Sequence, residues 1–281
     1  MVIEETVAFV ENLLYKVNGE KKIVIVDNNS SNGSGKELQR MYLDNPDITI
    51  ILNNENLGFA KGNNIGYRYA KEHFQPKFIA IANNDIELPQ PEFIQLVEDI
   101  YKKEKFAVLG PEIFSTNEKI YQSPKKLSHY TYDQVLAERD KYAKRNASQF
   151  IVPLKSTLKK NKLVKSLNSK RKKITSQIDP TKKYVNPIIH GSFLIVSELF
   201  IEKRDNAFFE GTYMYFETEI LDYQCQRDGL KVIYDPSVKV LHHHSTSTAS
   251  SFSSELKKVR FMNRCILDSL NAFLVEMEKE K

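Results

Sequence analysis

The stretch Phe78–Leu88, FIAIANNDIEL, decides how the rest of the chain is interpreted. Its apolar start, Phe78–Ile81, is short and carries β-branched residues, which favours a buried strand over a helix. The polar residues Asn83, Asn84 and Asp85 follow where that strand would leave a sheet. Ligands of open α/β sheets bind outside the carboxyl ends of the strands. Asp85 beside two amides therefore suits a divalent cation that also binds phosphate, and an Asx-type turn without a ligand is the alternative.

The first part of the chain alternates helical and strand patterns. Three of the predicted strands end in an Asn or Asp, at Asp27, Asn53 and Asn84, which places polar groups along one rim of the sheet. The pattern also reflects the general tendency of strands to end in polar residues. The alternation predicts an α/β domain with a mostly parallel central sheet flanked by helices. We expect helices over 4–17, 36–43, 58–70 and 91–103, and strands over 22–26, 48–52, 78–81 and 106–113.

Composition excludes several classes of protein. An apolar content of 41% is typical of a globular chain, and 281 residues can bury a substantial core. Two cysteines cannot form a disulfide framework, which favours a reducing compartment. The start, MVIEE, lacks the features of a signal peptide, and no apolar run is long enough to span a bilayer. We therefore expect a cytoplasmic protein.

A basic segment interrupts the middle of the chain. Periodicity weakens over 115–184, and residues 155–183 contain eleven Lys or Arg and a single acid, Asp179. Residues 155–173 combine these charges with scattered leucines, as does an amphipathic helix that lies on an anionic membrane. A solvated helical insertion without a partner is the alternative. No nucleic-acid partner is expected, because interleaved aromatic residues and a recognisable DNA or RNA module are lacking.

Regular patterns return at residue 185. Residues 187–196 predict a strand interrupted at Gly191 and Ser192, where a backbone can approach a ligand closely. Further strands are expected over 230–234 and 238–241, and helices over 216–227 and 255–274. The last strand ends in His242, followed by His243 and His244.

Six motifs in this order resemble the family 2 inverting glycosyltransferases of the nucleotide-sugar-binding GT-A fold, especially rhamnosyltransferase-like enzymes. They are IVIVDNNSSNGS, NNENLGFAKGNNIGYRYA, AIANNDIEL, HGSFLIV, MYFETEIL and YDPSVKVLHHH. The resemblance covers 4–114 and 185–247. It implies a nucleotide-sugar-binding half (1–114), an uncovered basic insertion (115–184) and an acceptor and catalytic half (185–281). The implied activity is transfer of a sugar, with inversion, from a UDP- or dTDP-linked donor to a saccharide or lipid-linked acceptor in bacterial surface polysaccharide synthesis.

The resemblance also assigns residues to the donor. Asp27 matches an acid that binds the base or ribose, and Asn29 follows it in the same motif. The loop Asn56–Asn64 contributes Asn56, Gly58 and Asn63, whose amides reach sugar or phosphate oxygens. Asn84 and Asp85 match a two-acid motif reduced here to one acid, which makes Asp85 the ligand of a Mn²⁺ or Mg²⁺ cofactor.

Glu217 matches the acid that opens the family's Glu-Asp pair, and so becomes the catalytic base. The usual second acid is Thr218 here, and Glu219 follows it. On a helix the side chains of 217 and 219 point about 200° apart, so only one faces a cleft, and Glu219 is the second choice. Exposed helix acids without a role are the alternative. His242 matches a histidine that completes the metal or diphosphate site.

One departure concerns the start of the fold. The family's first strand, central in the sheet and beside the nucleotide, has no counterpart in this sequence. A late gene start, a truncated copy, or a strand supplied by a partner chain or another segment would each explain it. A non-catalytic, nucleotide-sugar-binding relic is therefore the main alternative function. A nucleotidyltransferase lacks its phosphate loop here, and a Rossmann domain lacks its G-x-G-x-x-G.

Overall fold

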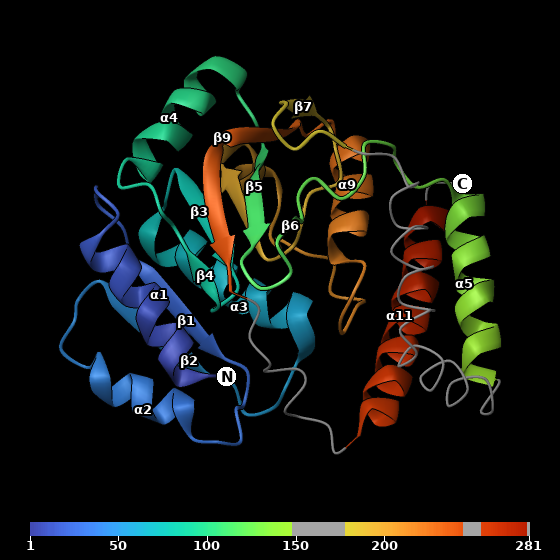
Figure 1. Cartoon of the computed structure of the whole chain (residues 1–281), viewed down its shortest axis with the longest axis horizontal. Coiled ribbons are helices and arrows are strands. Elements are labelled where there is room, and N and C mark those ends of the chain that lie inside the picture. The colour runs from blue at the N-terminus through green and yellow to red at the C-terminus, as the bar shows by residue number, and fades with distance from the viewer. Residues whose placement is uncertain (148–177, 244–253, 280–281) are drawn as a thin grey trace.

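A computed structural model describes residues 1–147, 178–243 and 254–279 (Figure 1). Helices and strands alternate in its N-terminal part, in the order α1 (Ile3–Tyr15), β1 (Ile23–Asp27), α2 (Ser34–Met41), β2 (Ile48–Leu52), α3 (Gly58–Phe74), β3 (Phe78–Ala82), β4 (Ile86–Glu87), α4 (Phe93–Glu104) and β5 (Val108–Ser115). The other elements are β6 (Ile120–Tyr121), α5 (Tyr132–Ala147), β7 (Tyr184–Val185), β8 (Phe193–Ser197), α8 (Glu198–Lys203), α9 (Glu217–Arg227), β9 (Val232–His242) and α11 (Glu255–Glu278).

The strands form two hydrogen-bonded groups. β1 and β2 pair in parallel. The larger group has the order β3-β8-β5-β9-β4, with β6 beside β5 and β7 beside β9. In it, β5 and β9 run parallel, and the other pairs are antiparallel. The predicted α/β class, with a sheet flanked by helices, is confirmed. Among the longer strands of the larger group, β3, β5 and β9 run in the same direction, and β8 runs opposite to them between β3 and β5.

The pattern of β8 explains why this sheet needs helices on both faces. Phe193 and Ile195 point into one hydrophobic cluster, with α4, and Leu194 and Val196 point into the other, with α3, α8 and α9. Successive side chains of a strand point to opposite faces, so a strand that is apolar throughout must be covered twice. All five residues of β8 are buried, which places it at the centre of the fold.

α5 and α11 pack side by side at one flank of the molecule (Figure 1). A third cluster holds them to α9 through Val135, Ile220, Leu270 and Phe273. α5 lies in the predicted insertion, where the sequence indicated helical structure in general but not this helix. None of the helices in the described ranges is both long and apolar enough to cross a bilayer.

Most predicted elements agree with the structure to within a few residues. Two predictions need correction. The two strands expected over 230–234 and 238–241 form one strand, β9, with irregular pairing opposite Pro111 and Glu112, and the strand expected from residue 187 begins at Phe193. The predicted basic helix at 155–173 and His244 lie outside the described residues.

The sheet is interrupted between β1 and β3. Within the described residues β1 bonds only to β2, and β3 bonds only to β8. α3 packs against both β1 and β3. Ala80, in the middle of β3, is exposed, whereas a strand with neighbours on both edges and helices on both faces buries such a residue. The prediction of a further central strand stays a prediction.

Candidate active site

The polar cluster after β3 meets the end of β9 at one edge of the sheet. β4 pairs with the end of β9 so that Ile86 lies opposite His242. The Nε2 atom of His242 lies 3.2 Å from Oδ1 of Asp85, and both side chains are buried. Oε1 of Gln122 lies 2.7 Å from Nδ1 of His242 and fixes the ring orientation. The structure thus places the two predicted metal ligands side by side.

Asp85 and His242 fit a divalent cation as two adjacent ligands. Ligands at right angles on one octahedral cation, each about 2.1 to 2.3 Å from it, lie about 3.0 to 3.2 Å apart. A carboxylate oxygen with an imidazole nitrogen suits Mn²⁺. In the part of the chain that the structure describes, no three His, Cys, Asp or Glu form a metal-binding group. Substrate oxygens and water would therefore supply the other ligands. The amide nitrogen of Asn84 points instead to α1, 3.1 Å from Oγ1 of Thr6.

His190 lies beside this pair and was not predicted as a site residue. Its ring centroid is 6.0 Å from that of His242, and its Nδ1 atom lies 2.9 Å from the Oγ atom of Ser192. The backbone N–H of Asn83 donates to the carbonyl of Ser192, which joins the end of β3 to the start of β8. The interruption predicted at Gly191 and Ser192 was the nearest signal in the sequence, and His190, which precedes it, brings a second imidazole to the site.

Glu217 opens α9 at a strained turn. Tyr215 and Phe216, which precede it, have φ values of 76° and 68°, in a region that non-glycine residues rarely adopt. Such strain persists where the surrounding structure enforces it, often at functional sites. Glu217 is 7% exposed, and its Oε1 atom has no hydrogen-bond partner among the described residues. A buried carboxylate oxygen left open in this way is available to a substrate hydroxyl.

The environment of Glu217 tunes its acidity. Burial, with a smaller contribution from the charge of Glu219, raises the pKa of Glu217 to about 7. Hydrogen bonds from the backbone of Glu217 and Tyr215, and the charge of Lys125, act in the opposite direction. A carboxylate with a pKa near neutrality accepts a proton at little cost, as a general base must.

Glu219 is already engaged by other side chains. It forms a short ion pair with Lys125, and Oγ1 of Thr218 donates to it at 3.2 Å. Nζ of Lys125 also donates to Oγ1 of Thr218 at 3.2 Å. Lys125 was not predicted, because the segment before α5 has no periodic pattern. The geometry therefore separates the two acids, leaving Glu217 open and Glu219 paired.

The start of α9 adjoins the histidine segment. A Cβ atom on Gly191 would lie 3.3 Å from Cγ2 of Thr218, so glycine permits this close approach. The residues around Asp85, His190 and Glu217 therefore share one region of the molecule, although they follow different strands.

Asp27 ends β1 and lies under the start of α2. It is buried, and its Oδ2 atom accepts from the backbone N–H of Ser30 at 3.2 Å. A Cβ atom on Gly35 would come within 2.3 Å of Oδ2, so this position of α2 requires glycine. The Oδ1 atom of Asp27 has no partner among the described residues. It is free to accept from a ligand N–H or hydroxyl.

The predicted donor loop is held by Asn28 rather than by Asn29. Oδ1 of Asn28 accepts from the backbone N–H of Leu57 and from the side chain of Asn53, and its Nδ2 donates to Gly58 and Asn56. Asn29 is exposed, with a φ of 60°, and is thus not part of this hydrogen-bond network.

The other residues of this loop have local roles. Oδ1 of Asn56 accepts from the backbone N–H of Gly58 at 3.0 Å, and the amide of Asn63 donates to the carbonyl of Phe59. Gly58 has a φ of 81°, and a Cβ atom there would clash with the carbonyl of Tyr213. The loop therefore packs against the segment that leads to Glu217.

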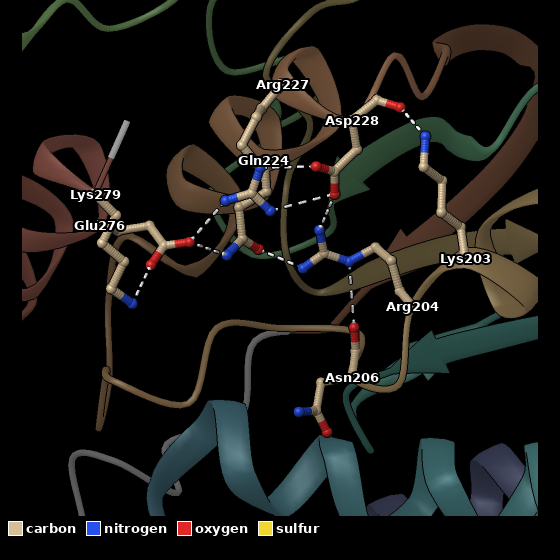
Figure 2. A network of polar contacts seen from close by, with 8 residues as sticks. All are labelled: Lys203, Arg204, Asn206, Gln224, Arg227, Asp228, Glu276 and Lys279. Carbon is tan, nitrogen blue, oxygen red and sulfur yellow. Dashed lines mark hydrogen bonds and ion pairs between the residues drawn. The ribbon is translucent and has the colours of Figure 1, made fainter. Parts of the chain in front are cut away.

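A polar network fixes the far end of α9 (Figure 2). Gln224 and Arg227 of α9 both donate to Oε1 of Glu276 in α11, at 2.9 and 3.0 Å. Arg204, after α8, pairs with Asp228 at 2.8 Å and also reaches Gln224. The helix that begins with Glu217 is thereby tied to two other helices.

Comparisons with known proteins agree with this architecture. The sequence model described as glycosyl transferase family 2 matches residues 2–196. The low-salt glycan biosynthesis hexosyltransferase Agl10 of Haloferax volcanii is 28% identical over 106 residues, which are 38% of this chain and 33% of that protein. The match thus spans about a third of the relative's length.

Solved structures show the same fold at low identity. The mannosyltransferase PcManGT from Pyrobaculum calidifontis, in complex with GDP-Man and Mn²⁺, has a TM-score of 0.52 and 12% identity, over 99% of this chain and 72% of that chain. S. aureus TarS 1–349 in complex with UDP-GlcNAc has a TM-score of 0.52 and 11% identity, over 92% and 62%. GalNAc-T7 with UDP, GalNAc and Mn²⁺ has a TM-score of 0.51 and 13% identity, over 86% and 41%.

The fold is therefore that of a GT-A glycosyltransferase. Because the family match covers more than half of the sequence, the chain belongs to glycosyl transferase family 2.

Proposed function

We propose that this chain transfers a sugar from a nucleoside diphosphate donor, UDP- or dTDP-linked, to a hydroxyl of a saccharide or lipid-linked acceptor, with inversion. The observation that carries the proposal is the open, buried carboxylate of Glu217 in the same region as Asp85 and His242. The hexosyltransferase name of the Haloferax relative and the nucleotide-sugar complexes of the structural neighbours support it.

Glu217 acts as the general base. Its carboxylate takes the proton of the acceptor hydroxyl while that oxygen forms a bond to the anomeric carbon. The bond from the anomeric carbon to the diphosphate breaks at the same time, and the nucleoside diphosphate leaves with the electron pair. Because attack and departure occur on opposite faces, the configuration inverts. Glu219, paired with Lys125, is the second choice for this role.

The residues predicted to bind the donor are proposed to contact different parts of the nucleotide sugar. Asp27 binds the base or ribose through its open oxygen. Asn29, Asn56, Gly58 and Asn63 line the path to the phosphates, together with Asn84. Asp85 and His242 hold Mn²⁺ or Mg²⁺, which neutralises charge on the leaving diphosphate when it is bound.

The cellular setting is proposed from the same line of argument. The reaction belongs to polysaccharide synthesis at a bacterial surface, with rhamnose or another hexose as the sugar. The protein works in the cytoplasm, in peripheral contact with the inner face of the membrane through residues 155–173. A strand from another polypeptide segment completes the sheet between β1 and β3, and the exposed Ala80 in β3 supports this part of the proposal.

The test is release of nucleoside diphosphate from a panel of UDP- and dTDP-sugars, with Mn²⁺ and a mixture of saccharide and polyprenyl phosphate acceptors. We expect release with one donor class, and Glu217→Gln should reduce it at least about a hundredfold. Binding of a nucleoside diphosphate without turnover of any donor would favour the alternative, a non-catalytic nucleotide-sugar-binding relic.

A further inference from the structure

Six basic residues gather where α5 ends and α11 begins. They are Lys144, Arg145, Lys257, Lys258, Arg260 and Arg264, named here the basic end. The amide of Asn146 donates to the carbonyl of Asn263 at 3.1 Å, which brings these helix ends together (Figure 1). Most of the six side chains are exposed, and Arg145 and Lys258 are half-buried. Glu255 is the single acid in α11 before Asp268.

Among the residues that the structure describes, the charges of the basic end lack carboxylate partners. Within the described ranges, none of the six forms an ion pair, whereas Lys141, one turn earlier in α5, pairs with Glu138. At the other end of α11, Lys279 pairs with Glu276. Unpaired cations of this density repel one another, and the dipole of α11 disfavours positive charge in its first turns. Helix stability therefore does not account for the basic residues of α11, whereas Lys144 and Arg145, in the last turn of α5, suit the dipole of that helix.

Apolar and aromatic side chains lie between these cations. Leu256, Val259, Phe261 and Met262 are all partly exposed. Phe261 packs edge-on against Tyr213, which is 38% exposed, at a centroid distance of 6.1 Å. A surface that mixes basic and apolar residues along a helix suits the interface of an anionic bilayer better than a nucleic-acid backbone, which calls for charge and stacking alone.

The position of the basic end relates it to the candidate active site. The carbonyl of Tyr213 accepts from the backbone N–H of Phe59, at the start of α3, at 2.7 Å. The same segment continues to Glu217, four residues later. A surface that binds at the basic end therefore lies beside the loop that joins the proposed donor and acceptor regions.

We propose that the basic end is a docking surface for an anionic lipid bilayer, on which the first turns of α11 lie against the headgroups. The contact is peripheral, combining attraction of the six cations to acidic headgroups with shallow insertion of Leu256 and its apolar neighbours. This contact uses residues outside the 155–173 segment and needs no sugar donor. Its test is therefore independent of the transfer reaction.

The test is co-sedimentation of the full chain with vesicles of neutral phosphatidylcholine, with or without about one third phosphatidylglycerol. We expect binding only to the anionic vesicles, decreasing as salt is raised. The variant Lys257→Glu/Lys258→Glu/Arg260→Glu should lower the partition coefficient at least about tenfold, because each basic residue near an anionic surface contributes about fivefold.

Matched variants separate the basic end from other sources of charge. Lys36→Glu/Arg40→Glu/Lys103→Glu changes the net charge equally on other exposed surfaces, and should keep most of the binding. After replacement of the basic residues 170–173 by Ser, part of the binding to anionic vesicles should remain and should depend on salt. The basic-end variant should lack this part of the binding. The proposal would be overturned if both charge-reversal variants lost vesicle binding equally. It would also be overturned if the 170–173 replacement abolished vesicle binding while the basic-end variant kept all of it.

Insertion has a direct optical readout, because the chain contains no Trp. Leu256→Trp should shift its emission to the blue with anionic vesicles and stay unchanged with neutral ones. An unchanged emission with bound protein would contradict docking through α11. Tighter binding to poly(U) than to anionic vesicles, lost in the same basic-end variant, would contradict it too and indicate a nucleic-acid surface.

Discussion

Nε2 of His242 lies 3.2 Å from Oδ1 of Asp85, where the end of β9 meets β4. This contact joins two residues that follow different strands, and its length matches two neighbouring ligands of one octahedral cation.

The contact between Asp85 and His242 leads to a prediction about metal dependence. Asp85→Asn should weaken nucleoside diphosphate binding at least about tenfold with Mn²⁺ and little without it, because the amide keeps the shape but not the charge. Titration calorimetry measures the affinity for the nucleoside diphosphate with and without Mn²⁺. Glu87→Gln, at a half-buried neighbour in β4, is the control; equal effects of Mn²⁺ on wild type and Asp85→Asn would contradict the assignment.

Replacing Glu217, the proposed base, should lower the reaction rate without lowering the stability of the fold. Glu217→Gln should lower kcat by about a hundredfold to ten-thousandfold while donor binding is kept. The free energy of unfolding near pH 8 should not fall, because a neutral amide avoids the cost of burying a charge. The comparison is Glu219→Gln, for which we expect a smaller loss in kcat. A larger loss from the Glu219 change would exchange the roles of the two acids.

The raised pKa of Glu217 predicts how stability varies with pH. The folded state holds this proton up to a pKa of about 7, whereas an unfolded glutamate releases it near 4.5. Between these values the folded state binds more protons, so its free energy of unfolding decreases as pH rises, by at most about 3 kcal/mol. Denaturant unfolding at pH 5 and pH 7.5 measures the slope. Glu217→Gln should lack this component, and an identical slope in both proteins would refute it.

Lys125 should set the working pH range. Removing its charge in Lys125→Met leaves Glu219 unpaired, and both changes raise the pKa of Glu217. The groups that act on Glu217 are Glu219, Lys125, Tyr215 and Cys265. The acid limb of the profile of kcat against pH should therefore move to higher pH, and Lys125→Arg should restore it. Lys126→Met, which removes the neighbouring charge, is the control; an unchanged limb in Lys125→Met would show that Lys125 has no electrostatic role.

The network in Figure 2 predicts a stability effect far from the chemistry. Glu276 is 5% exposed and accepts from Gln224, Arg227 and Lys279. Glu276→Ala leaves the buried amide of Gln224 without its acceptor, removes one partner of Arg227, and should cost about 1 to 3 kcal/mol of unfolding free energy. Thermal unfolding measures it, with Glu72→Ala, at an exposed acid of α3, as the reference. A change as small as that of the reference would mean that water replaces Glu276 without loss.

Local patterns were sufficient to predict where polar residues leave the strands. Asp27, Asp85 and His242 follow apolar runs, which places them at strand ends, and the family resemblance selected them among the polar residues there. The direction of β8 could not be predicted, because an apolar strand of five residues can run parallel or antiparallel to its neighbours.

Residues that act through tertiary contacts were missed for a related reason. Lys125 lies in a segment without periodicity, and its partner Glu219 comes from a distant part of the sequence. His190 lies in a predicted strand, and its contact with Ser192 forms only in the local turn. Asn28 and Asn29 are adjacent and chemically identical, so no sequence pattern distinguishes between them. The positive φ of Asn29 turns one amide away from the loop that the other holds.

The central claim is that the rim formed by Asp27, Asp85 and His242 binds a nucleoside diphosphate with a divalent cation. Thermal unfolding of the wild-type chain with UDP, dTDP, GDP and ADP, each with and without Mn²⁺, tests it most directly. At about 100 times its Kd, a ligand that binds only the folded state stabilises by about 2.7 kcal/mol. We predict a Mn²⁺-dependent rise in Tm with UDP or dTDP. No rise with any of the nucleotides would contradict the account.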